Sequence, residues 1–206
     1  MSALLTLATL VAFAANSLFC RMALATGAID PVGFTAIRIG SGALVLVALA
    51  RRWSRGGRGT LDAGSWGSAA ALFVYALGFS LAYVSLDTGV GALVLFGAVQ
   101  ATMIGLAILA GERPRAMEWL GIAVALGGLA YLVRPGVRAP DPVGVALMIA
   151  SGIGWGIYSV RGRVSPTPVE ATAGNFLRAV PMVALGAAFG WTSLHMNLRG
   201  VVLAIV

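Results

Sequence analysis

Long apolar runs separated by short polar connections form the main pattern of this chain. An α-helix needs about 20 apolar residues to cross a hydrocarbon core of about 30 Å. Runs of that length are expected at 3–22, 32–50, 66–86, 89–110, 117–133, 142–160 and 172–191. An eighth run begins near Gly200 and extends to Val206. The pattern therefore predicts an all-α polytopic membrane bundle with seven full transmembrane helices plus the start of an eighth.

Proline and glycine mark the expected helix boundaries. Asp30-Pro31 and Asp141-Pro142 each place a proline in the first turn of a helix, where its missing N–H group is not needed. Gly111-Glu112-Arg113-Pro114 ends one expected helix and precedes the next. Since all these connections are short, successive helices should run antiparallel.

Composition supports a lipid environment. Hydrophobic residues make up 59% of the chain and charged residues only 10%. In a soluble domain, roughly a quarter of all residues are charged. The net charge is +7, but the basic residues lie mainly in loops and form no stripe interleaved with aromatic residues. This excess is better explained by membrane orientation than by nucleic-acid binding. We expect the lipid bilayer as a partner and no nucleic acid.

The arginines are distributed unequally between the two sets of loops. One set holds Arg51, Arg52, Arg55, Arg58, Arg113, Arg115, Arg161 and Arg163. The opposite set holds Arg21, Arg134, Arg138 and Arg199. Loops rich in arginine stay on the cytoplasmic side, so the N-terminus is predicted to be cytoplasmic.

A shift of 140 residues brings like residues of the sequence into coincidence. The coinciding pairs are Arg21 with Arg161, Asp30 with Glu170, and Arg38 with Arg178. The shift spans five helices, and an odd number places the second copy in the membrane upside down. Inverted repeats of this kind are typical of secondary transporters, whose central site is exposed alternately to each side.

Several stretches resemble the EamA-type transporters of the drug/metabolite transporter superfamily. They are the segment from Ile29 to Arg38, the segment from Leu81 to Leu132 with its Leu109-Ala110-Gly111-Glu112-Arg113-Pro114 junction and the following Glu118-Trp119-Leu120-Gly121, and the segment from Asp141 to Tyr158. The resemblance covers essentially the whole chain. It implies a small-molecule exporter of a bacterial inner membrane, with ten helices in two inverted copies of five.

Compared with that pattern, the chain supplies one complete copy and part of another. Residues 1–136 would form the first five-helix repeat, and 141–206 would form a partial second one. The last six residues would rise only about 9 Å as a helix and could not span. We therefore expect a truncated product, and a non-transporting remnant or structural membrane partner stays as the alternative function. Dimerisation to complete a bundle, as a homodimer, is also open.

Polar groups inside a bilayer are costly and mark candidate sites. The candidate substrate-binding residues are Asn16, Arg38, Tyr75, Gln100, Trp155, Tyr158, Asn175 and Arg178. The two arginines either line vestibules that attract anionic groups, or extend to the interface and cap carbonyl groups of neighbouring helices. Each amide must find a partner or face a cavity. The aromatic residues either hold apolar or cationic solutes or serve as packing.

Other residues are given structural roles. Glu112, Arg113 and Pro114 are interpreted as a structural junction, and Gly152-x-Gly154-x-Gly156 as a close-packing helix face. No acidic residue lies in the middle of an expected span, so the sequence gives no support for proton coupling. The single Cys20 and single His195 predict neither a disulfide framework nor a metal cluster. With no nucleophile elbow or phosphate loop, we expect a non-enzymatic protein without a cofactor.

Overall fold

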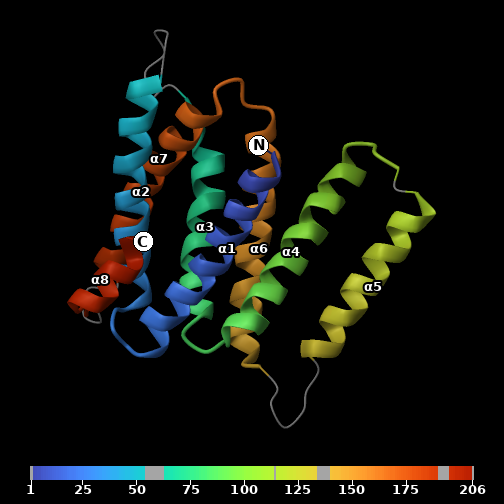
Figure 1. The fold of residues 1–206 in the computed structure, drawn as a ribbon, viewed down its shortest axis with the longest axis horizontal. Coiled ribbons are helices and arrows are strands. Elements are labelled where there is room, and N and C mark those ends of the chain that lie inside the picture. The colour runs from blue at the N-terminus through green and yellow to red at the C-terminus, as the bar shows by residue number, and fades with distance from the viewer. Residues whose placement is uncertain (1, 54–62, 114, 134–139, 190–194, 206) are drawn as a thin grey trace.

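The structure, a computed structural model, describes residues 2–53, 63–113, 115–133, 140–189 and 195–205. The regular elements in these ranges are eight α-helices (Figure 1). They are α1 (Ser2–Ala25), α2 (Pro31–Trp53), α3 (Trp66–Ala82), α4 (Thr88–Leu109), α5 (Ala116–Val133), α6 (Pro142–Arg163), α7 (Pro168–Phe189) and α8 (Leu198–Ile205). The predicted all-α fold is confirmed for this part of the chain.

Four of the helices, α1, α2, α4 and α6, are long and apolar enough to cross a membrane. Helix α3 is also apolar but has 17 residues. Helix α7 has 22 residues, but Asn175, Arg178 and Pro181 lie within it. The predicted number of seven full spans is therefore supported for four helices and stays a prediction for α3, α5 and α7.

Helix α6 lies between α3 and α4 and packs closely on both, through its glycines. A Cβ atom on Gly154 would lie 2.8 Å from the carbonyl oxygen of Ala71 in α3. A Cβ atom on Gly152 would lie 2.8 Å from the carbonyl oxygen of Leu95 in α4. Small residues allow this approach of two backbones, so the packing role predicted for the glycine-rich face of α6 is confirmed.

The helix ends show the expected capping chemistry. The Asp141 carboxylate accepts a hydrogen bond from the Gly144 N–H at the start of α6, at 2.6 Å. At the end of α4, Gly111 adopts φ +95°, and the Glu112 N–H donates to the Ala107 carbonyl at 3.0 Å. This is a Schellman motif, in which glycine takes the left-handed position after the helix. The junction after α4 is therefore a helix stop, and its Pro114 lies outside the described residues.

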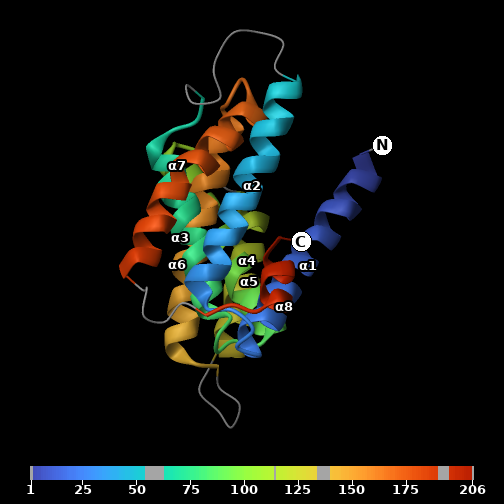
Figure 2. The same ribbon diagram turned by 90° about the vertical axis from the view of Figure 1, so that its left-hand side faces the viewer.

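Helices α5 and α1 extend away from the central bundle. Figure 1 shows α5 beside α4, at the edge of the bundle. Figure 2 shows α1 inclined outwards, with its N-terminal half away from the other helices. Leu4 and Leu10 in that half are 73% and 61% exposed, as expected for side chains that face lipid.

Candidate functional site

A cavity of about 930 Å³ lies among α1, α2, α3, α6, α7 and α8. Its wall is mostly apolar and aromatic, with Asn16, Arg38 and a few hydroxyl groups as its polar part. Among the described lining residues, Arg38 is the only one that carries a formal charge. A largely apolar cavity with few, separated polar groups is the usual form of a small-molecule site.

An aromatic cluster from α3 and α6 forms one wall of the cavity. The ring of Trp155 lies 4.6 Å from that of Tyr75 and is stacked on Tyr158 at 5.4 Å between centroids. Phe13 of α1 meets Trp155 edge-on at 6.1 Å. These distances lie within the range of favourable aromatic pairs, so the wall is a packed unit built from three helices.

The close approach of α3 and α6 holds this wall in place. The Ser151 hydroxyl, which is buried, donates a hydrogen bond to the Tyr75 carbonyl at 2.8 Å. Gly154 lies one residue before Trp155 and is in backbone contact with Ala71 and Tyr75. A larger residue at Gly154 would push the two helices apart, so the position of the aromatic wall depends on this glycine.

Arg38 lies at the cavity wall about two turns into α2, roughly 10 Å along the helix from its first residue. Its guanidinium carbon lies 5.8 Å from the centroid of Phe34 and 5.7 Å from that of Phe79. Both rings are within reach of a cation–π interaction. In the part of the chain that the structure describes, the Arg38 side chain forms no hydrogen bond to protein and no ion pair.

The donors of Arg38 are accessible from the cavity. Within the described residues, no fully buried side-chain nitrogen or oxygen is left without a hydrogen-bond partner. The Arg38 side chain is only partly buried, so its nitrogen atoms without protein acceptors are reached from the cavity space. Asn16 and Tyr75 line the same cavity. Polar chemistry is therefore concentrated where α1, α2 and α3 meet.

Arg178 and Asn175, in contrast, anchor the connection that precedes α3. Arg178 donates from Nη1 to the carbonyl oxygens of Ala63, at 2.6 Å, and Gly174, at 3.1 Å. The Asn175 side-chain oxygen accepts a hydrogen bond from the Ser65 N–H at 2.8 Å. Neither residue lines the cavity. Arg178 therefore caps carbonyl groups, but these belong to the connection before α3 and to α7 itself, and not to a neighbouring helix as the sequence interpretation had it.

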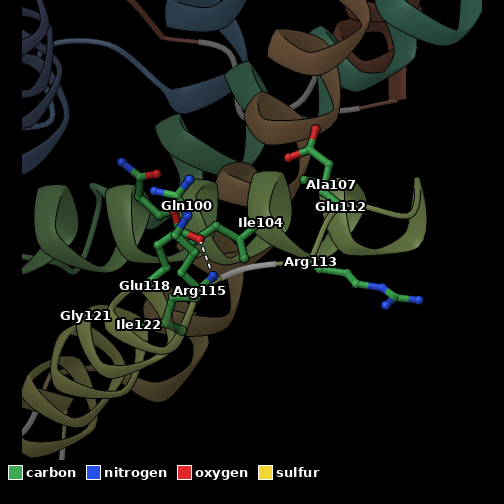
Figure 3. A pocket seen from close by; sticks show the side chains of 9 residues that line it. All are labelled: Gln100, Ile104, Ala107, Glu112, Arg113, Arg115, Glu118, Gly121 and Ile122. Atoms are coloured by element: carbon green, nitrogen blue, oxygen red, sulfur yellow. Dashed lines mark hydrogen bonds between the residues drawn. The ribbon is translucent and has the colours of Figure 1, made fainter.

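Gln100 lies at a different hollow, of about 850 Å³, between α4 and α5. Figure 3 shows Gln100 with the charged side chains of Glu112, Arg113, Arg115 and Glu118 around this pocket. The Glu118 carboxylate accepts from the Arg115 N–H at 2.7 Å, which is the return bond of a capping box at the start of α5. Since all of these side chains are exposed, the pocket is an open surface of helix ends.

Five of the eight predicted substrate-binding residues thus surround one cavity: Asn16, Arg38, Tyr75, Trp155 and Tyr158. Gln100, Asn175 and Arg178 lie elsewhere. Phe34 and Phe79, the aromatic partners of Arg38, are not among the residues predicted from the sequence. The four-residue spacing of Phe34 and Arg38 on one helix face could have indicated the first. In the described ranges, no group of three or more His, Cys, Asp or Glu side chains is arranged to hold a metal ion.

Similarity to known proteins points to an inner-membrane transporter. The chain is 36% identical over 78 residues to the uncharacterized inner membrane transporter YedA of Escherichia coli K12. It is 51% identical over 182 residues to the uncharacterized protein PA1977 of Pseudomonas aeruginosa. No family model matches the chain. The chain therefore has distant similarity to a transporter of the inner membrane. Its apolar helices agree with a membrane location.

The extent of these matches differs. The PA1977 match covers 88% of this chain and 63% of the relative, and the YedA match covers 38% and 24%. The chain also matches a solved crystal structure with a TM-score of 0.64 and 27% sequence identity, over 97% of this chain and 74% of the other. Its helical arrangement is therefore shared with an experimentally determined fold.

Proposed function

We propose that this chain is the substrate-binding part of an EamA-like carrier of the drug/metabolite transporter superfamily, which exports small organic molecules across the bacterial inner membrane. The observation that carries the proposal is the cavity with Arg38 and the aromatic wall. Three of the helices that line it, α1, α2 and α6, are long and apolar enough to cross a membrane. Similarity to YedA supports the same class of function. The finer features, alternating access and an inverted repeat, are part of this proposal.

Two arginines at corresponding repeat positions support the inverted arrangement. Arg21, near the end of α1, donates to the carbonyl oxygens of Tyr83 and Val84 just after α3, both at 2.9 Å. Arg161, near the end of α6, donates to Ser68 at 3.0 Å in the first turn of α3. The two arginines thus contact opposite ends of one helix, as expected for residues that an inverted repeat would place on opposite sides of the membrane.

The cavity has one closed end. Phe34, which lines the cavity in the first turn of α2, is only 1% exposed. Towards the opposite end the lining continues to Thr9, Val45 and Thr172, and there α1 diverges from the bundle (Figure 2). With the N-terminus on the cytoplasmic side, as the arginine distribution predicts, this conformation is open to the cytoplasm. Alternating access requires a second conformation that is open to the other side.

Cysteine accessibility tests this mechanism without a known substrate. Ser41 lines the cavity and is half-buried, so the conservative variant Ser41→Cys places a thiol inside it. We expect a membrane-impermeant thiol reagent to modify this variant in both right-side-out and inverted membrane vesicles. The wild type is the control for Cys20, which is buried, and Leu93→Cys on the exposed face of α4 is the control for lipid-facing positions.

Modification of Ser41→Cys from one side only would contradict alternating access. That result would favour the alternative function, a non-transporting membrane partner whose cavity binds a ligand from one side. Modification at the rate of Leu93→Cys would mean that the cavity is not reached by water, and would contradict both functions.

A further inference from the structure

We propose that the cavity selects an organic anion, with Arg38 binding the negative group and the wall of Tyr75, Trp155 and Tyr158 holding an apolar body. The transport of this anion rests on the proposed function, whereas its binding does not. The proposal starts from an imbalance of charge, because Arg38 is the only charged residue among the described residues of the cavity wall.

The positive charge of Arg38 is energetically costly at the cavity wall. A guanidinium withdrawn from water is stable only when its charge is compensated. Two phenylalanine rings stabilise the charge of Arg38 by cation–π interaction, but they do not neutralise it. No carboxylate in the described part of the chain forms an ion pair with it. A bound anion would supply the missing charge.

The N–H donors of Arg38 also favour an anionic ligand. An arginine has five N–H donors in a planar fork that fits a carboxylate or a phosphate with two parallel bonds. Arg178 donates to two backbone carbonyls, whereas the donors of Arg38 face the cavity without an acceptor among the described residues. An acceptor with two oxygen atoms, such as a carboxylate, fits this arrangement better than a single hydroxyl group.

The charge of Arg38 excludes an organic cation as the ligand of this cavity. Aromatic walls also bind organic cations, and the Tyr75–Trp155–Tyr158 cluster alone would permit one. A cation next to these rings would lie in the same cavity as Arg38, however, and would be repelled by it. The described lining residues include no Asp or Glu to offset that repulsion. The charge on the wall therefore decides in favour of an anion.

The test uses three ring compounds of similar size and different charge: benzoate, neutral benzamide and cationic benzylammonium, with phenylacetate and octanoate as further carboxylates. Binding to the full chain purified in detergent is followed by tryptophan fluorescence and by isothermal calorimetry. We expect at least one carboxylate to bind at least about tenfold more tightly than benzamide, as a charge-assisted pair would give. Benzylammonium should not bind.

The variant Arg38→Gln should lose this preference for the carboxylate, and Arg38→Lys should keep part of it. The matched control is Arg52→Gln, because Arg52 is exposed in the last turn of the same helix and lies outside the cavity. Gel filtration and thermal unfolding establish that each variant is folded. A fluorescence change that disappears in Trp155→Phe, with calorimetric binding retained, would place the ligand at the aromatic wall.

Three results would overturn the proposal: no binding of any carboxylate, no carboxylate that binds more tightly than benzamide, or a carboxylate preference that survives in folded Arg38→Gln. The outcome is separate from that of the cysteine experiment. Access from both sides without anion preference would leave a carrier with a different substrate class. Anion preference with access from one side would leave an anion-binding membrane protein that does not transport.

Discussion

Arg38 and Arg178 coincide when the sequence is shifted by 140 residues, but their surroundings differ. Arg178 donates to the backbone carbonyls of Ala63 and Gly174 and thereby holds the connection before α3. Arg38 lies between two phenylalanine rings and the cavity, without a polar partner in the described residues. Two arginines on similar sequence positions thus differ in the acceptors around them. Arg178 has a structural role, and Arg38 is the one that we propose binds a ligand.

The connections that follow α2 and α7 explain the difference. After α2, Gly64 adopts φ +80°, and this turn brings the Ala63 carbonyl to Arg178. Before α8, the backbone of His195 instead forms two hydrogen bonds with Asp30: the His195 N–H donates to the Asp30 carboxylate at 3.2 Å, and the Asp30 N–H donates to the His195 carbonyl at 3.0 Å. The described part of the second connection is therefore held two turns away from Arg38, at the helix start.

The largest expected effect separates the two arginines. Arg178→Gln should lower the free energy of unfolding by about 1–3 kcal/mol, because the partly buried Ala63 and Gly174 carbonyls lose a charged donor. Arg38→Gln should cost less, about 1 kcal/mol at most, since it loses two cation–π contacts but no hydrogen bond or ion pair in the described protein. Thermal or denaturant unfolding in the same detergent measures both. Equal destabilisation by the two substitutions would remove the distinction on which the comparison rests.

A smaller effect is expected at Asn175, which anchors the same connection through one hydrogen bond. Asn175→Ala removes the acceptor of the Ser65 N–H and should cost about 1 kcal/mol of stability. Because Asn175 lies outside the cavity, the carboxylate preference should not change once the protein is folded. A loss of that preference in a folded variant would show that the connection before α3 also shapes the binding site.

The sequence was sufficient for the helices but not for the site. Prolines at residues 31 and 142 and the glycine at residue 111 marked helix ends that the structure confirms, because these residues act on their own local backbone. Arg38 and Arg178 could not be distinguished in this way. Their difference depends on where the connections before α3 and α8 dock, and docking is a tertiary property. Both interpretations of each arginine were therefore left open by the sequence.

The position of Gln100 also could not be predicted from the sequence. It lies in the middle of an expected span, where an amide needs a polar partner, and this made it a candidate for the cavity. Helix α4 is apolar around its whole circumference, however, so the sequence does not show which of its faces meets α6. The structure places Gln100 towards α5, on the side away from the aromatic wall.

The smallest expected effect on stability is at the contacts of Arg21, which has both carbonyl and carboxylate partners. It donates to the carbonyls of Tyr83 and Val84 and approaches the Asp87 carboxylate at 3.5 Å, where Asp87 is 86% exposed. Exposed ion pairs contribute little, because water screens them and ordering the side chains costs entropy. Asp87→Asn should therefore lower stability by less than about 1 kcal/mol, and less than Arg178→Gln does. A loss as large as that of Arg178→Gln would mean that the carboxylate, and not the backbone carbonyls, holds Arg21. The argument that carbonyl acceptors make an arginine structural would then no longer extend from Arg178 to Arg21.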